Sequence, residues 1–179
     1  MTEKNCREEI IFAGFGGQGV ILLGKLMATA AMKAGYEVTY IPSYGAEVRG
    51  GTANCSVIID NEPIASPLVT EPDTLIVMNQ ASFDKFVPKI KPRGLLVMNT
   101  SLIETPPDRD DIEVMGVAAD EIAHQLKSPR SANMIALGVY LKKRGLLTPQ
   151  QVAESLPYVL AKRHHDMLDV NTRALMHGG

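Results

Sequence analysis

The sequence has no tryptophan and only two cysteines in 179 residues. Cys6 lies in the polar N-terminal segment, and Cys55 lies in a stretch that alternates like a β-strand. Two cysteines placed so far apart are too few to ligate an iron–sulfur cluster or a structural zinc ion. We therefore predict no metal site in this chain, and any cluster that works with it must belong to a partner.

Neither a surplus of one charge nor a long apolar run is present. Lys and Arg total 18 against 20 Asp and Glu, which gives a net charge of -2 and no electrostatic footprint for nucleic acid. No apolar run approaches the roughly 20 residues that span a bilayer, and residues 1–9 lack the apolar core of a signal peptide. We expect a cytoplasmic protein that binds neither nucleic acid nor a membrane.

The composition is otherwise ordinary for a globular protein. Hydrophobic residues make up 45% of the chain and charged residues 21%, and a chain of this length can bury a good core. The sequence shows no internal repeat, low-complexity tract or linker. These features predict a single domain over residues 1–179.

Apolar runs of strand length alternate with helical patterns along most of the chain. Strands are predicted at Glu9–Ala13, Tyr36–Ile41, Thr52–Ile59, Thr74–Met78, Gly94–Met98 and Ile112–Val117. Helices are predicted at about Gly17–Ala34, Ser82–Val87, Ala118–Leu126, from Asn133 onward, from Pro149 with Thr148 as N-cap, and at about Tyr158–Leu175. The alternation predicts an α/β fold that is three-layered and Rossmann-like, with a mostly parallel sheet and a helical C-terminal part.

One antiparallel element is expected in this sheet. After the third predicted strand, Asp60 and Asn61 form a turn signal, and a short return strand is predicted at Pro63–Ala65. The resulting hairpin would make the sheet mixed rather than wholly parallel.

Two glycine-rich loops follow the first two predicted strands. The sequence Gly-Phe-Gly-Gly-Gln-Gly occupies positions 14–19, and Ser-Tyr-Gly-Ala-Glu-Val-Arg-Gly-Gly occupies positions 43–51. We expect the two strands to be parallel neighbours, so that both loops emerge at the carboxyl edge of the sheet, where α/β proteins place ligands and partners.

The first loop is a candidate anion or phosphate site. Gly14 is expected to permit a tight turn, Gly16 to remove a side chain where something approaches the backbone, and Gly19 to let the next helix lie close to the sheet. The free amides at the start of that helix attract anions. The candidate binding residues are Gly14, Gly16, Gly17, Gln18 and Gly19.

Two other interpretations of this loop stay open. A dinucleotide site also needs an acidic side chain at the end of the second strand. That strand ends in Thr-Tyr-Ile-Pro, and Glu37 lies at its beginning, which argues against NAD or FAD. A tight strand-to-helix turn that binds nothing is equally compatible with the glycines.

The second loop places two charged side chains on a glycine-rich backbone. Its candidate interface residues are Tyr44, Gly45, Glu47, Arg49 and Gly50. Arginine with an aromatic neighbour is enriched among interface anchors, and loops often carry function. The competing interpretation is a local ion pair between Glu47 and Arg49 that orders the turn and contributes about 0–1 kcal/mol if it is exposed.

No catalytic constellation is recognisable. Ser43 has no histidine nearby in the sequence, and nothing resembles a nucleophile elbow. His164 and His165 are adjacent, so on a helix they point about 100° apart. With Asp169 they lack a third ligand at suitable spacing, and a solvated face is the favoured interpretation.

The two loops together resemble a known family. Residues 14–20 followed by residues 43–55 closely resemble the gamma subunit of 2-oxoacid:ferredoxin oxidoreductases. Further matches are Asn79, Gln80, Asn99, the run Asn133–Gly138, Asn171 and Ala174. The resemblance spans about residues 9–175.

The resemblance implies a subunit rather than a complete enzyme. In this family the alpha and beta subunits carry thiamine diphosphate, with its Mg²⁺, and a ferredoxin-like delta subunit carries iron–sulfur clusters. The complex oxidatively decarboxylates a 2-oxoacid, transfers the acyl group to coenzyme A and reduces ferredoxin. This chain is then expected to be a non-catalytic gamma subunit of a heterotetramer, without a cofactor of its own and inactive alone.

The substrate and the alternative function are less closely defined. The second loop resembles the 2-oxoglutarate branch more than the pyruvate branch, and branched-chain 2-oxoacids stay open. The first loop can contact coenzyme A or only pack against a neighbouring subunit. The alternative from another class is a free-standing Rossmann-like protein that binds a nucleotide or phosphate.

Overall fold

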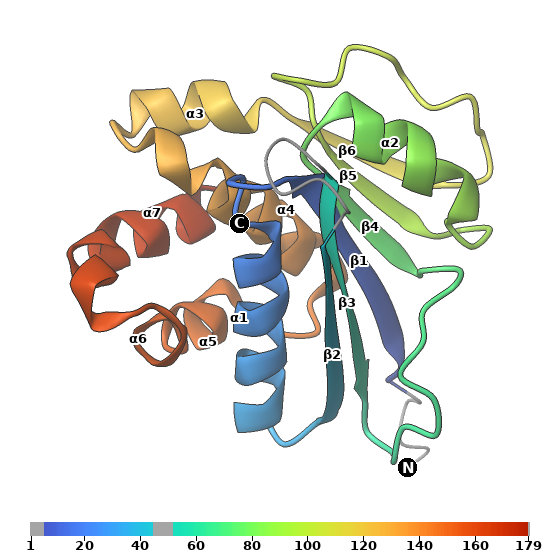
Figure 1. Cartoon of the computed structure of the whole chain (residues 1–179), viewed down its shortest axis with the longest axis horizontal. Coiled ribbons are helices and arrows are strands. Elements are labelled where there is room, and N and C mark those ends of the chain that lie inside the picture. The colour runs from blue at the N-terminus through green and yellow to red at the C-terminus, as the bar shows by residue number, and fades with distance from the viewer. Residues whose placement is uncertain (1–5, 45–51, 179) are drawn as a thin grey trace.

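A six-stranded sheet with helices on both faces forms the protein in the computed structural model, which describes residues 6–44 and 52–178 (Figure 1). The strands are β1 (Glu8–Phe15), β2 (Glu37–Tyr44), β3 (Thr52–Asp60), β4 (Thr74–Val77), β5 (Leu95–Asn99) and β6 (Glu113–Val117). The helices are α1 (Val20–Lys33), α2 (Gln80–Phe86), α3 (Ala119–Gln125), α4 (Ala132–Arg144), α5 (Pro149–Ala153), α6 (Leu156–Val159) and α7 (Leu168–Gly178). Three 3₁₀ segments occupy Val87–Lys89, Pro129–Ser131 and Lys162–Met167.

The sheet has the strand order β2-β3-β1-β4-β5-β6. β1, β4, β5 and β6 are parallel to one another, whereas β3 is antiparallel to both of its neighbours, β1 and β2. The predicted three-layer α/β architecture with a mixed sheet is therefore confirmed.

The predicted adjacency of the first two strands is wrong. β3 lies between β1 and β2, pairing Phe15 with Thr52 and Tyr44 with Ala53. Because β1 and β2 both run antiparallel to β3, they point in the same direction. Their ends therefore still reach the same carboxyl edge of the sheet, one strand apart.

The position of the predicted hairpin is also wrong. Residues Pro63–Ala65 form no strand, and the chain passes from β3 to β4 through irregular structure. Both edges of β3 are already occupied by β1 and β2, so a return strand has no backbone to pair with. The antiparallel neighbours that follow each other in sequence are β2 and β3.

Two apolar cores lie on opposite faces of the sheet. The larger packs α1, α3, α4 and α7 against one face, and the smaller packs α2 against the other. In α1 the apolar side chains of Val20, Leu23 and Met27 are buried, and so is the adjacent small-residue face of Gly24, Ala28 and Ala31. In α4 the face formed by Met134, Leu137 and Leu141 is buried as well.

The C-terminal region differs from the single long helix predicted for residues 158–175. α6 ends at Val159, Leu160 is extended with ψ 132°, and a 3₁₀ segment precedes α7. A ring nitrogen of His165 lies 3.2 Å from the carbonyl oxygen of Leu160, within hydrogen-bond distance. This contact stabilises the extended conformation of Leu160, where the helix is interrupted. No glycine or proline lies at the break. The helical pattern of apolar residues therefore predicted one continuous helix across it.

Candidate functional site

The glycine loop leaves β1 through a turn that Gln18 closes. The amide of Gln18 donates to the carbonyl oxygen of Phe15 at 3.1 Å, and the side-chain Oε1 of Gln18 accepts from the amide of Phe15 at 2.7 Å. Gly17 and Gly19 have φ values of 100° and 74°, a region that residues with a Cβ rarely adopt. Glycine is thus needed at both positions to hold this turn.

The structure distributes the roles of the glycines differently from the prediction. A Cβ on Gly14 would lie 3.0 Å from Cγ1 of Val20 and 3.1 Å from Cβ of Met78, so Gly14 permits the close approach of α1 and the end of β4. A Cβ on Gly19 would instead overlap the side-chain amide of Asn133 in α4. Gly19 is therefore the N-cap of α1 in a left-handed conformation, and its lack of a side chain lets α4 pack closely against it.

The loop leaves hydrogen-bond donors available. Across residues 6–44 and 52–178, the amides of Gly16, Gly17 and Gly19 donate to no protein acceptor. Gly19 caps α1 without a side-chain cap, and the first turn of α1 contains no acidic residue. Free amides and the positive end of a helix dipole favour an anion here.

A cavity of about 260 Å³ adjoins this loop. It brings together the glycine loop, the first turn of α4, the 3₁₀ segments on either side and α7. Its lining residues are Gly17, Gln18, Gly19, Leu22, Arg130, Asn133, Met134, Leu160, His164, Met167 and Asn171. No aspartate or glutamate is among these described lining residues.

Two buried asparagines supply amide groups to the cavity wall. Asn133 donates through Nδ2 to the carbonyl oxygen of Gly19 at 3.2 Å, which fixes the loop against α4. Asn171 accepts through Oδ1 from the hydroxyl of Ser131 at 2.9 Å. Its Nδ2 donates to no acceptor within the described residues, and it is not among the fully buried side-chain atoms that lack a partner. This group is therefore a donor that a ligand atom could accept from.

The exposed side chains of Arg130 and His164 lie at the same cavity. Together with the loop amides and Asn171, they make a donor-rich lining with an apolar wall from Leu22, Met134 and others. Such an arrangement can hold an acidic group beside an apolar one. The predicted site for an acidic group thus includes Arg130, a side chain that the sequence analysis did not single out.

The second loop is described only at its start. Tyr44 ends β2 and is 73% exposed, whereas Gly45, Glu47, Arg49 and Gly50 lie outside the described residues. Phe15, at the end of β1, is also exposed on this edge. The proposed interface therefore begins with exposed aromatic side chains on both sides of β3.

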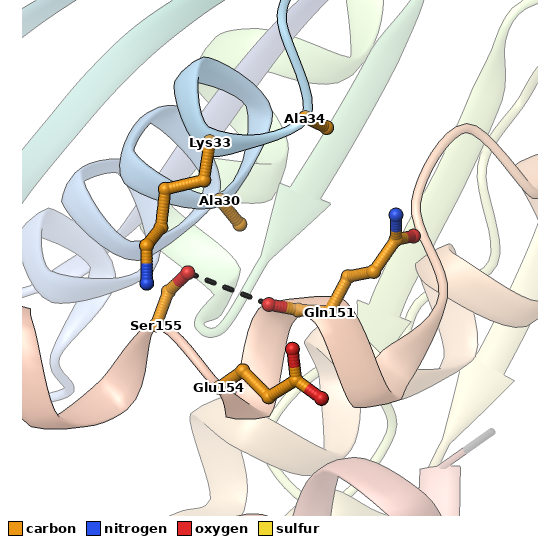
Figure 2. A pocket seen from close by; sticks show the side chains of 6 residues that line it. All are labelled: Ala30, Lys33, Ala34, Gln151, Glu154 and Ser155. Carbon is orange, nitrogen blue, oxygen red and sulfur yellow. Dashed lines mark hydrogen bonds between the residues drawn. The ribbon is translucent and has the colours of Figure 1, made fainter.

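A second cavity, of about 300 Å³, lies between the C-terminal end of α1 and helix α5 (Figure 2). Lys33 there lies 3.5 Å from the ring centroid of Tyr158, and Glu154 accepts a hydrogen bond from Gln150. Its charged groups thus already have partners within the chain. The glycine-loop cavity is the stronger candidate site because its donors are free.

Within residues 6–44 and 52–178, no group of three or more His, Cys, Asp or Glu side chains could hold a metal ion. Of the histidine pair considered above, His164 accepts from Nε of Arg163 at 3.2 Å. No helix in this part of the chain is long and apolar enough to cross a membrane.

The fold defines an α/β domain with a donor-lined cavity, the candidate site, beside the glycine loop at the carboxyl edge of a mixed sheet. The chain belongs to the pyruvate ferredoxin/flavodoxin oxidoreductase family, whose sequence pattern matches residues 9–179. Its homologues are gamma-type subunits of 2-oxoacid:ferredoxin oxidoreductases, as the loop motifs predicted.

Two curated relatives illustrate the range of the family. The chain is 36% identical over 168 residues to the ketoisovalerate oxidoreductase subunit VorA of Methanothermobacter thermautotrophicus, covering 93% of this chain but 34% of VorA. It is 32% identical over 153 residues to the 2-oxoglutarate synthase subunit KorC of Methanocaldococcus jannaschii, covering 84% of this chain and 82% of KorC. This chain thus spans about a third of VorA and most of KorC.

Two solved structures share the fold over nearly the whole chain. The gamma subunit of a keto/oxoacid ferredoxin oxidoreductase from Geobacter sulfurreducens superposes with a TM-score of 0.84 at 27% identity, covering 97% of this chain and 94% of that one. The 2-oxoglutarate:ferredoxin oxidoreductase from Magnetococcus marinus, solved with 2-oxoglutarate, coenzyme A and succinyl-CoA, has a TM-score of 0.86 at 29% identity. The match covers 98% of this chain and 31% of that one.

Proposed function

We propose that this chain is the gamma subunit of a 2-oxoacid:ferredoxin oxidoreductase. The observation that supports this most is its likeness, over almost its entire length, to a gamma subunit of the same size and to one third of a longer oxidoreductase chain. A unit that is a separate chain in some relatives and part of a longer chain in others works beside the remainder of that longer chain.

The proposed complex converts a 2-oxoacid and coenzyme A to an acyl-coenzyme A, CO₂ and reduced ferredoxin. Alpha and beta subunits would carry thiamine diphosphate and Mg²⁺, and a delta subunit would carry the iron–sulfur clusters that pass electrons to ferredoxin. The absence of an acid–base or nucleophilic constellation from the sequence supports a non-catalytic role for this chain.

We propose 2-oxoglutarate as the substrate of the complex. The sequence of the second loop supports this choice, as does the similarity to KorC over 82% of its length. A 3-methyl-2-oxobutanoate (ketoisovalerate) substrate is the second candidate, because identity to VorA is 36% over 168 residues. Turnover of the assembled complex with the two acids side by side would separate these candidates.

The glycine-loop cavity is proposed to take an acidic group, and a phosphate of coenzyme A is the candidate. The free amides of Gly17 and Gly19 and the guanidinium of Arg130, all from residues that line the cavity, would face that group. The oxidoreductase from M. marinus was solved with coenzyme A bound. What supports the assignment here is the chemistry of the lining, whose described residues offer donors and no carboxylate.

Co-expression with the candidate large subunits tests the proposal. The chain is expected to co-purify with them and to be required for coenzyme-A-dependent reduction of ferredoxin or a viologen dye. The isolated chain is expected to show no such turnover. A chain that stays alone in these preparations and binds NAD, ATP or coenzyme A with micromolar affinity would instead be a free-standing nucleotide-binding protein.

A further inference from the structure

Asn79 lies outside the cavity, between the end of β4 and the start of α2, and is 2% exposed. Both atoms of its side-chain amide are engaged. Oδ1 accepts from the amide of Ser82 at 2.8 Å and thereby caps α2. Nδ2 donates to Oε1 of Gln18, in the glycine loop, at 3.3 Å. Asn79 thus connects a helix cap on one face of the sheet to the loop that begins α1 on the other.

Both side-chain amide atoms of Gln18 also form hydrogen bonds. Its Oε1 accepts from Phe15 as well as from Asn79, and its Nε2 donates to the carbonyl oxygen of Met78 at 3.1 Å. The side chain is therefore turned toward the ends of β1 and β4. The absence of a side chain on Gly14 makes this possible, because a Cβ there would lie 2.7 Å from Oε1 of Gln18.

The direction of these bonds sets the orientation of the Gln18 amide. Because Nδ2 of Asn79 can only donate, it requires the oxygen of Gln18 to face it. That orientation leaves Nε2 to face the carbonyl oxygen of Met78 and keeps Oε1 on the amide of Phe15. A reversed amide would lose the bonds to Phe15 and Met78 together.

We propose that Asn79 is a positioning residue of the glycine-loop site, which it orients through Gln18 without touching the ligand. The inference rests on the proposed function only for the identity of the ligand, the acidic group of coenzyme A. The structural part of the proposal does not depend on the ligand. It states that the Asn79 side-chain amide sets the conformation of residues 15–19, in which the backbone amides of Gly16, Gly17 and Gly19 stay free for an anion.

Asn79→Ser separates the two roles of this residue, the N-cap of α2 and the hydrogen bond to Gln18. Serine is as good an N-cap as asparagine, so the bond to the amide of Ser82 has a replacement, whereas the donor to Gln18 is lost. Asn79→Asp also keeps the cap and removes the donor, and agreement between the two variants excludes an effect of the added charge. Ser82→Ala is the matched control, because its buried hydroxyl has no partner within the described residues.

Residue-resolved amide hydrogen exchange on the full chain gives the first readout. In Asn79→Ser the amide of Phe15 should exchange about tenfold faster, because its acceptor is no longer held, while the amide of Ser82 stays protected. In a Gln18→Ala background, Asn79→Ser should add no further change at Phe15. Unchanged exchange at Phe15, or a further change in the Gln18→Ala background, would overturn the inference.

The Michaelis constant for coenzyme A in the assembled complex gives the second readout. Asn79→Ser should raise it about tenfold with kcat within about twofold, whereas Ser82→Ala should leave both unchanged. If Phe15 exchanges faster but the Michaelis constant stays the same, Asn79 is a brace of the loop and not a positioning residue of a ligand site. If the unmodified chain supports no coenzyme-A-dependent turnover at all, the proposed function fails, and the exchange data alone decide the structural part of the proposal.

Discussion

Gly24 of α1 lies directly against the thiol of Cys55 in β3, so that a Cβ on Gly24 would overlap Sγ of Cys55. The ring of Tyr40, in β2, would be 3.0 Å from the same Cβ. Cys55 is fully buried, and its Sγ donates to the carbonyl oxygen of Val20 at 3.2 Å. Burial raises the pKa of this thiol to about 12, so the thiol stays protonated and acts as a packing group.

Gly24→Ala is therefore expected to destabilise the chain even though alanine favours helices. Overpacking a tight contact costs about 1–3 kcal/mol, whereas the gain in helix propensity is about 1 kcal/mol. The free energy of unfolding in urea should fall accordingly. In a Cys55→Ala background the cost of Gly24→Ala should shrink by at least about 1 kcal/mol, because the overlapping sulfur is gone. Equal costs in both backgrounds would show that this contact does not limit the packing of α1.

Glu8, at the start of β1, gives the folded chain a defined pH dependence. Burial raises the pKa of Glu8, although a hydrogen bond from Thr74 at 2.6 Å and the nearby guanidinium of Arg144 act in the opposite direction. Because the folded pKa lies above the unfolded one, the stability from this group is complete below the unfolded pKa. It is lost as the pH rises through the folded pKa.

Glu8→Gln removes this titration while keeping an oxygen that can accept from Thr74. Urea unfolding of both chains at a series of pH values from about 4 to 7 should show the unmodified chain losing stability relative to Glu8→Gln as the pH rises. A difference between the two chains that grows in favour of glutamate toward neutral pH would mean that the ion pair with Arg144 outweighs burial.

Local sequence signals predicted the parts of the fold that depend on local chemistry. α5 begins at Pro149 with Thr148 as its N-cap, as predicted, and Thr148 forms a complete capping box with Gln151. The strand order could not be read in the same way. Whether β3 lies beside β1, β2 or both depends on pairings between distant segments, and the alternating residue types of β3 fit either choice.

In the candidate site, too, the features that depend on local sequence could be predicted, and those that depend on contacts between distant segments could not. Its backbone was visible as a glycine pattern, because left-handed φ values and close packing leave a mark on residue type. Among its side chains, Asn133 and Asn171 stood out only as matches to the family, and Arg130 was not singled out at all. These residues reach the cavity only because α4 and α7 pack beside the start of α1, more than 100 residues along the chain from the glycine loop.

Arg130 provides a test of the proposed acidic ligand. Arg130→Glu reverses an exposed charge at the cavity, and the Michaelis constant of the assembled complex for coenzyme A should rise about tenfold, since hydrogen bonds to charged groups contribute about 1.5–3 kcal/mol. Arg173→Glu is the matched control, an exposed arginine on α7 that does not line the cavity. The difference between the two variants should narrow at high salt. Equal changes in the Michaelis constant in the two variants would indicate that the overall charge of the protein, rather than a site at Arg130, affects the binding of coenzyme A.

Arg49 tests the second loop as an assembly surface. Exposed ion pairs contribute little, so Arg49→Ala should leave the stability of the isolated chain within about 1 kcal/mol of the unmodified one. If Arg49 is an interface anchor, the same change should weaken binding to the large subunits by about 2 kcal/mol or more. Thermal melts of the free chain and affinity measurements with the partners would check both halves, with Lys25→Ala, on the exposed side of α1, as the control. An Arg49→Ala chain that melts far lower alone yet assembles normally would show that the loop is an internal brace, because the lost interactions would then lie within this chain rather than between subunits.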